Sequence, residues 1–267
     1  MPDTIALQLD NLSAGFACRA VVEDVSISVS KGTVMGIAGA NGAGKSTLLK
    51  TIARLIPPVK GKIFIDGSEL CTMPLPELAQ KIAYVAQDIS SSRDLTVEEM
   101  VALGRNPHQK WWQWRSEGKD KAAIEQAIKA TELLDLRQKA IAEISGGERQ
   151  RAAIAMSLAQ EPAILLLDEP TAHLDFKHQK SLLQLLLRLK SEGMTVVTCL
   201  HDLNFIAQVC DQVLCLKKNS GAPSTPLFAG PPRDVLTAEN LQSAFDTELK
   251  IIRDSSDSQS SSIYFGL

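Results

Sequence analysis

Hydrophobic and polar residues alternate through much of the first thirty positions of the chain. The alternation covers residues 5–12 and 21–29, and in the second stretch Val25, Ile27 and Val29 are separated by serines. A β-strand turns successive side chains to opposite faces, so this pattern predicts strands with one buried face. We therefore expect the chain to open with an antiparallel, strand-rich segment.

Three later segments are apolar along almost their whole length, which is typical of strands buried on both faces. They are residues 33–38, 163–167 and 195–200. Helical patterns alternate with them. These are predicted at residues 45–56, 148–160, 182–189 and 238–245. Strands that alternate with helices predict an α/β fold with a mainly parallel sheet, in which the functional side chains lie at the C-terminal ends of the strands.

The character of the sequence changes between residues 88 and 140. A capped helix start at 94–100 is followed by a break at Asn106-Pro107, and helical spacing returns at 120–134. Together with the helix that follows, we interpret about residues 88–160 as a helical insertion within one domain, residues 1–245. Residues 246–267 form a Ser-rich C-terminal extension, which we expect to be mobile.

Composition limits the class of protein. The 267 residues are 45% hydrophobic with a formal net charge of −3, which indicates a globular protein and argues against a general nucleic-acid binder. There is neither a basic signal sequence at the start nor an apolar run of about 18 residues, so we expect the chain in the cytoplasm. Its five scattered cysteines suit reduced thiols better than disulfides or zinc.

A complete phosphate-binding motif follows the first buried strand. Residues 39–46 satisfy the pattern G-x-x-x-x-G-K-[ST], between a predicted strand and a predicted helix. The glycines let the backbone wrap around phosphates, Lys45 brings a positive charge to the β- and γ-phosphates, and the Ser46 hydroxyl reaches Mg²⁺. The motif predicts a nucleoside triphosphate as ligand.

A pair of carboxylates ends the second buried strand. Asp168 can hold Mg²⁺ through water, and Glu169 can polarise a water molecule for attack on the γ-phosphate. Acidic pairs are common on protein surfaces. Here, however, an Ile-Leu-Leu-Leu run precedes the pair, so burial favours the functional interpretation.

A second glycine-rich turn opens a helix at residues 144–151, Ile-Ser-Gly-Gly-Glu-Arg-Gln-Arg. The first N–H groups of a helix lack partners within it and can bind an anion. This turn is thus a second candidate phosphate site on the same chain.

Three single residues carry weaker signals. Gln87, after a strand-like segment, could contact Mg²⁺ or the attacking water. His201, at the end of the third buried strand, could bind the γ-phosphate or simply cap the turn that follows. Phe16 could stack on a base, although an aromatic residue in an N-terminal strand is usually part of the core.

In this order the motifs resemble the ATP-binding subunit of ABC transporters, over about residues 5–245. The resemblance gives each motif a family name. Residues 39–46 are the P-loop, Gln87 the Q-loop residue, 144–148 the signature, 164–168 with Glu169 the Walker B segment, 172–175 the D-loop, and His201 the switch histidine.

The resemblance implies an Mg²⁺-dependent ATPase with a P-loop NTPase core, an N-terminal antiparallel β subdomain and a helical insertion. The implied catalytic residues are Glu169, His201 and Lys45, and the implied Mg²⁺ ligands are Ser46, Gln87 and Asp168. The implied ATP contacts are Phe16, Gly39, Ala40, Asn41, Gly42, Ala43, Gly44, Lys45, Ser46, Thr47 and Gln87.

The resemblance also implies a head-to-tail homodimer in which one copy covers the ATP of the other. The signature residues acting in this way are Ser145, Gly146, Gly147 and Glu148, with Asp175 in the D-loop. Glu148 departs from the usual glutamine at its position. Because a carboxylate facing phosphate would be repelled, we expect it to point outward.

Several stretches look like importers of iron–siderophore complexes, vitamin B12 and haem. They are residues 103–108, 168–175 with His178-Gln179, 200–204 and 235–237. This implies integral-membrane permease subunits as partners, an indirect link to a substrate-binding protein, no nucleic acid, and a peripheral position on the inner face of the cell membrane. Trp111, Trp112 and Trp114 suggest either a membrane contact or packing on the helical insertion.

Two other functions remain open at this point. One is a soluble ABC ATPase that acts in protein or iron–sulfur cluster assembly without transport. The other is a P-loop kinase of small molecules, which residues 145–147 disfavour because such kinases do not need a second glycine-rich turn.

Overall fold

The computed structural model describes residues 4–87, 94–109, 118–172, 174–245, 250–253 and 263–266. The chain forms two compact units. Unit 1 comprises residues 1–72 and 190–267, and unit 2 comprises residues 73–189.

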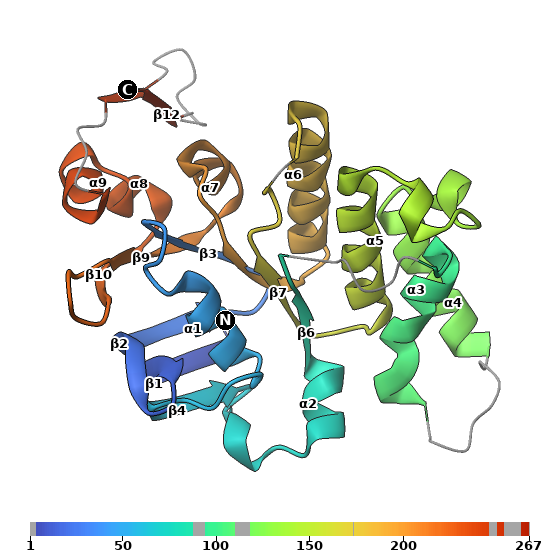
Figure 1. The fold of residues 1–267 in the computed structure, drawn as a ribbon, viewed down its shortest axis with the longest axis horizontal. Helices are drawn as coiled ribbons and strands as arrows, with labels where there is room; N and C mark the ends of the chain where they lie inside the picture. The colour runs from blue at the N-terminus through green and yellow to red at the C-terminus, as the bar shows by residue number, and fades with distance from the viewer. Residues whose placement is uncertain are drawn as a thin grey trace. The chain divides into compact units, whose positions relative to one another are not determined.

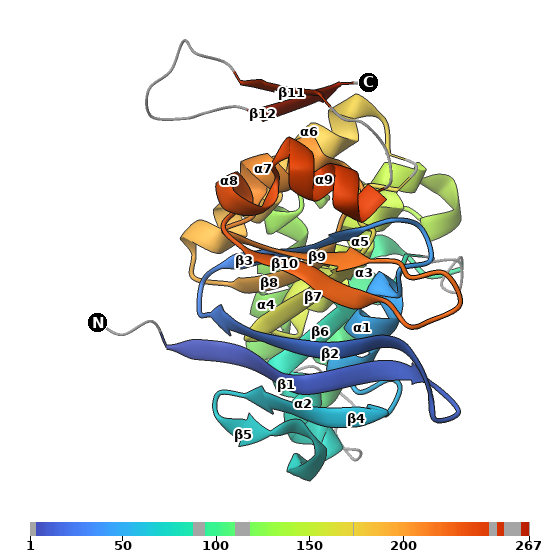
Figure 2. The same cartoon turned by 90° about the vertical axis from the view of Figure 1, so that its left-hand side faces the viewer.

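Unit 1 begins with an antiparallel sheet of four strands in the order β2-β1-β4-β5 (Figure 2). The strands are β1 (Ile5–Phe16), β2 (Arg19–Ser30), β4 (Lys60–Ile65) and β5 (Ser68–Glu69). Val25, Ile27 and Val29 of β2 are buried and the residues between them are exposed, as their alternation predicts. This sheet confirms the antiparallel opening of the fold.

The second sheet of unit 1 leads into the predicted phosphate-binding loop, residues 39–46. Strand β3 (Val34–Gly39) lies between β8 (Thr195–Cys199) and β9 (Gln212–Lys217), parallel to both, and β10 (Thr225–Gly230) pairs antiparallel with β9. Every residue of β3 and β8 is buried, because α1 and α7 pack against this part of the sheet. The helices of unit 1 are α1 (Lys45–Ile52), α7 (Leu203–Val209), α8 (Pro232–Val235) and α9 (Ala238–Phe245).

The described residues of unit 2 are mainly helical and include a parallel pair of strands (Figure 1). Its helices are α2 (Leu75–Lys81), α3 (Val97–Ala102), α4 (Gly118–Ala130), α5 (Gly146–Ala159) and α6 (Phe176–Ser191), the last of which ends just past the unit. The paired strands are β6 (Ile82–Val85) and β7 (Ile164–Asp168). Short 3₁₀ turns complete the helical part at residues 103–108, 134–136 and 141–143.

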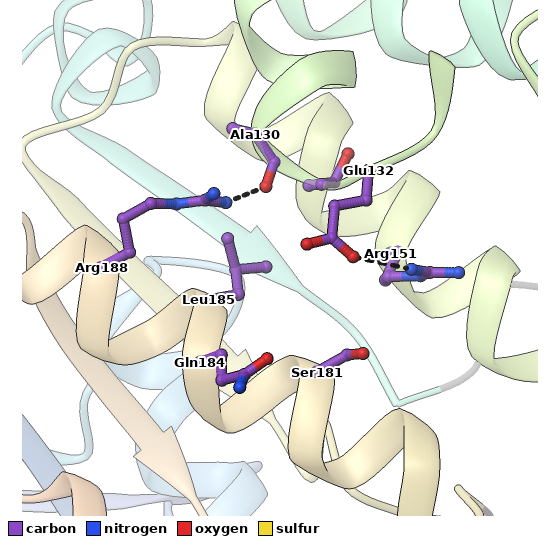
Figure 3. Close-up of a pocket in the computed structure, with 8 residues that line it drawn as sticks. Ala130, Glu132, Arg151, Ser181, Gln184, Leu185 and Arg188 are labelled. Carbon is purple, nitrogen blue, oxygen red and sulfur yellow. Dashed lines mark hydrogen bonds and ion pairs between the residues drawn. The ribbon is translucent and has the colours of Figure 1, made fainter. Parts of the chain in front are cut away.

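A small cavity of about 40 Å³ lies between α5, α6 and the end of α4 (Figure 3). In Figure 3, Arg188 of α6 points to Ala130, whose carbonyl accepts a hydrogen bond from the guanidinium group. Glu132 faces Arg151 of α5 at 3.7 Å. Because the last carbonyls of a helix have no partner within it, Arg188 caps α4. The Glu132–Arg151 pair links the end of α4 to α5, which opens with the signature turn.

A buried arginine joins the helices of unit 2. Arg105 is 4% exposed, and its Nε lies 2.9 Å from a carboxylate oxygen of Asp120 in α4. Its Nη1 donates to the carbonyl of Ala159 at the end of α5 and to the carboxylate of Glu161, both at 2.6 Å. Asp120 is itself almost fully buried. The cation therefore neutralises a carboxylate that would otherwise be costly to bury.

Arg105→Leu should lower the free energy of unfolding by about 3 kcal/mol, because it leaves the buried Asp120 carboxylate uncompensated. Urea denaturation followed by circular dichroism measures the change. Lys31→Leu is the control, since Lys31 forms an exposed pair with Asp66, at 2.7 Å, of the kind worth at most about 1 kcal/mol. Equal losses for the two variants would contradict the role of Arg105.

Several predicted features fall outside the described residues or differ from them. Trp111, Trp112 and Trp114 lie outside, as does His173 of the D-loop. Within the C-terminal extension the structure has two short antiparallel strands, β11 (Lys250–Arg253) and β12 (Ile263–Gly266), which the sequence did not suggest. No helix among the described residues is long and apolar enough to cross a membrane.

Candidate functional site

The phosphate-binding loop of unit 1 connects β3 directly to α1. Gly44, the residue before α1, has φ +84°. A Cβ atom there would lie 2.4 Å from Cγ2 of Val22, so the position demands glycine for both its backbone angle and its close packing. Strand, tight turn and helix thus follow one another as a phosphate cradle requires.

Lys45 lies inside this loop. It is 4% exposed, and its ammonium group donates to the carbonyls of Gly39 at 2.9 Å and Ala40 at 3.3 Å. These bonds hold the charge in the turn of the loop, where phosphate oxygens would approach. Ser46 and Thr47 follow it in the first turn of α1 and are half-buried.

Phe16 ends β1 and is not part of the core, since 54% of it is exposed. It borders a hollow of about 680 Å³ that the P-loop residue Gly42 also lines, together with Cys18 and Lys218. Lys218 donates to the carbonyl of Asn41 in the P-loop at 3.1 Å. An aromatic face and a phosphate loop on one hollow fit a ligand with a flat base and phosphates.

His201 follows β8 and is exposed. The helix after it, α7, is capped by Asp202, whose carboxylate accepts from the backbone N–H groups of Asn204 at 2.8 Å and Phe205 at 3.3 Å. Asp202, and not His201, therefore caps α7, so capping does not account for the histidine at this position.

Unit 2 holds the predicted carboxylates at the end of β7. Asp168 is 2% exposed and accepts a hydrogen bond from the Tyr84 hydroxyl at 3.0 Å. Glu169 has φ +50°, a conformation that is strained for a residue with a side chain. Nε2 of Gln87 donates to the Glu169 carboxylate at 3.0 Å. The structure therefore brings Gln87 and Glu169 together and adds Tyr84, which sequence reasoning missed.

Unit 2 also holds the second glycine-rich turn, at the start of α5. Ser145 is the N-cap, and its hydroxyl accepts from the backbone N–H of Glu148 at 3.3 Å. The Glu148 carboxylate in turn accepts from the backbone N–H of Ser145 at 2.7 Å. The expectation that this carboxylate points outward differs from the structure, in which it folds back onto the N-terminal cap of α5.

That bond holds the pKa of Glu148 below its ordinary value, mainly because the carboxylate accepts from the backbone of Ser145. A depressed pKa means that the folded state favours the charged form. The cap therefore contributes its stabilisation above the ordinary carboxyl pKa and loses it as the pH falls through the folded value.

A family model described as ABC transporter matches residues 22–172, more than half of the chain. The chain belongs to the ABC transporter family. The match spans the P-loop, the Q-loop residue, the signature and the Walker B carboxylates, and the resemblance stated from these motifs is confirmed.

Curated members of the ABC transporter family match nearly the whole chain. The ferric enterobactin transport ATP-binding protein FepC of Escherichia coli is 38% identical over 95% of this chain and 92% of its own. The iron(3+)-hydroxamate import ATP-binding protein FhuC of Bacillus subtilis is 37% identical over 93% of this chain and 91% of its own. Among solved structures, a chain of an inward-facing metal-chelate type ABC transporter has a TM-score of 0.83 and 29% identity, and covers 98% of this chain and 97% of its own.

As an ABC transporter ATP-binding subunit, the chain binds ATP and is an ATPase. Its residues also suit Mg²⁺. The three predicted ligands, Ser46, Gln87 and Asp168, offer hydroxyl, amide and carboxylate oxygens, the hard donors that Mg²⁺ prefers alongside phosphate oxygens.

The two signature glycines of this ABC ATPase differ in their surroundings. A Cβ atom on Gly147 would lie 2.4 Å from Cδ2 of His178, whereas one on Gly146 would meet only an Nη2 of Arg149, at 4.0 Å. His178 is held by Asp175 of the D-loop, whose carboxylate lies 2.7 Å from its Nδ1. The imidazole ring of His178 is therefore held between Asp175 and Gly147.

Gly147→Ala should lower the free energy of unfolding by about 1 to 3 kcal/mol, because the new methyl group overlaps the His178 ring. Gly146→Ala is the matched control. It adds the same methyl group to the same helix turn without overlap, and it should be neutral or stabilising since alanine is the better helix former. Guanidinium denaturation of both variants tests this, and equal behaviour would rule out the close contact.

Proposed function

We propose that this chain is the motor of an importer for a ferric siderophore or a related metal chelate such as cobalamin or haem. The observation that carries the proposal is the presence, on one chain, of two glycine-rich helix starts of the kind that binds phosphate, at Lys45 and at Ser145. Relatives that match over nine-tenths of the chain are named for ferric enterobactin transport and for iron(3+)-hydroxamate import, which supports the cargo class.

Two copies form the working unit in this proposal. Lys45 and the P-loop of one copy bind the β- and γ-phosphates of ATP, and Ser145, Gly146 and Gly147 of the other copy cover them with helix N–H groups. Phe16 stacks on the adenine. The capping box at Ser145 supports this role, because it orders the turn before any ligand arrives.

Hydrolysis then depends on Glu169. Its carboxylate accepts a proton from the attacking water, while Gln87, bonded to it at 3.0 Å, orients the group. His201 donates to the γ-phosphate. Mg²⁺ held by Ser46 and Asp168, with Gln87 as a further ligand, would neutralise charge on the phosphates.

The partners in this proposal are a pair of integral-membrane permease subunits, with a substrate-binding protein acting on the far side. The chain itself is cytoplasmic and peripheral, on the inner face of the membrane. The helical insertion transmits closure of the dimer to the permease. Part of that insertion, residues 88–93 and 110–117, lies outside the described residues.

Growth of a strain lacking the gene tests the proposal. With iron supplied only as a hydroxamate or a catecholate chelate, the deletion should abolish growth on at least one of them, and the native gene should restore it. Ferrous iron is the control source and should support growth throughout. Growth on every chelate, together with recovery of the tagged chain only in a soluble complex, would favour the assembly-type ATPase instead.

A further inference from the structure

His178, in the first turn of α6, lies flat against the signature turn. The Cβ position of Gly147 is 2.4 Å from Cδ2, 2.5 Å from Cγ and 2.9 Å from Nε2 of the ring. Real Cβ atoms essentially never come that close, so the ring occupies the space that any other residue at 147 would need. The absence of a side chain on Gly147 is thus what allows the contact.

The opposite edge of the ring is bonded to the D-loop. Nδ1 of His178 lies 2.7 Å from Oδ1 of Asp175, and the same oxygen accepts from the backbone N–H of His178 at 2.9 Å. Two bonds between one pair of residues fix both the start of α6 and the rotation of the ring. They also hold the pKa of Asp175 below its ordinary value, so the carboxylate is charged when it accepts them.

The ring is partly buried as well as bonded, since 22% of the His178 side chain is exposed, against 65% of the Asp175 side chain. The pKa of the next signature residue, Glu148, is low mainly because its carboxylate is hydrogen-bonded to Ser145, and a positive charge on His178 lowers it further. One imidazole therefore lies between an exposed D-loop carboxylate and the helix start that we propose covers phosphate.

We propose that His178 is a positioning residue that couples the D-loop to the signature turn, so that both engage the partner copy as one rigid surface. The inference rests on the proposed ATP-bound dimer. A preformed surface loses less conformational freedom on binding than one that must be ordered. The coupling needs both contacts of the ring. The bond to Asp175 fixes the rotation of the ring, and the packing of the ring on Gly147 then fixes the position of the signature turn.

Two substitutions separate these contacts. His178→Phe keeps a flat ring over Gly147 and loses the bond to Asp175. His178→Asn keeps a donor near the position of Nδ1 and loses the ring. Lys177→Ala, on the same helix turn but exposed, is the matched control. All are made in a chain that also carries Glu169→Gln, so that ATP is retained.

Two quantities are measured for each variant with ATP and Mg²⁺. The first is the affinity of the dilute, single chain for a fluorescent ATP analogue. The second is the ATP concentration that gives half-maximal dimer by light scattering. We expect the first to be unchanged and the second to rise roughly ten- to a hundredfold for both His178 variants. His178→Phe loses one hydrogen bond to a charged group, and His178→Asn loses the packing of the ring on Gly147. Lys177→Ala should match the parent in both.

A double mutant distinguishes coupling from a general loss of stability. Asp175→Ala should weaken dimer formation as His178→Phe does, and the two together should be no worse than either alone, because they break the same bond. Additive losses would overturn the inference. So would His178 variants that dimerise at the ATP concentration of the parent.

The parent chain reports separately on the dimer itself. If the Glu169→Gln chain binds ATP but stays single at every ATP concentration, the proposed dimer fails and the role of His178 fails with it. If the parent dimerises and the His178 variants do the same, only the role of His178 is overturned.

Discussion

Glu169→Gln should bind ATP and dimerise, yet hydrolyse ATP about 10²- to 10⁴-fold more slowly, the usual cost of losing a general base. The amide has the shape of the carboxylate and can still accept the hydrogen bond from Gln87, which is 3.0 Å long in the native chain. It cannot take a proton from water at neutral pH. Binding and chemistry should therefore separate in this variant.

Phosphate release at saturating ATP measures the rate, and light scattering measures the dimer. The control is Glu132→Gln, because Glu132 also has a positive φ, +57°, but lies at the end of α4 beside Arg151. It should retain native turnover. Near-native turnover of the Glu169 variant would remove Glu169 from the role of base.

Lys45→Ala should weaken ATP binding roughly 10²- to 10³-fold, since two charge-assisted hydrogen bonds to phosphate are lost. Its ammonium group is held in the turn of the loop by hydrogen bonds to the carbonyls of Gly39 and Ala40, whereas the other cation of α1, Lys50, lies in the last turn of the helix. Titration with a fluorescent ATP analogue measures the affinity.

Lys50→Ala is the control for that titration. Lys50 lies in the last turn of the same helix, and its removal should leave ATP affinity unchanged. A thermal melt of each variant shows whether the loop change alters folding. A folded Lys45→Ala chain with native ATP affinity would contradict the phosphate assignment.

The local motifs could be predicted from the sequence because each depends on residues close together in the chain. The P-loop can be recognised from its glycine spacing between a strand and a helix, and Asp168 can be recognised from the apolar run that precedes it. Strand β2 was predictable for the same reason, since the alternation at Val25, Ile27 and Val29 reflects one buried face.

Contacts that depend on register or on close approach could not be predicted. Tyr84 reaches Asp168 because β6 and β7 pair with Tyr84 beside Leu166, and no sequence pattern specifies that register. The contact of Gly147 with His178 joins residues 31 positions apart through two different helices. The side-chain direction of Glu148 depends on a cap whose bonds form only once the turn exists.

The cysteines of this chain give it a chemical reporter. Cys199, Cys210 and Cys215 are buried, and burial raises the thiol pKa of Cys215 to about 11, so these thiols react slowly with alkylating reagents. Cys71 is exposed, but its thiol donates to the Glu69 carboxylate, which raises its pKa. Cys18 is exposed and borders the hollow beside Phe16. A maleimide probe should therefore label Cys18 first, and occupancy of the hollow by nucleotide can be followed as protection of that one thiol.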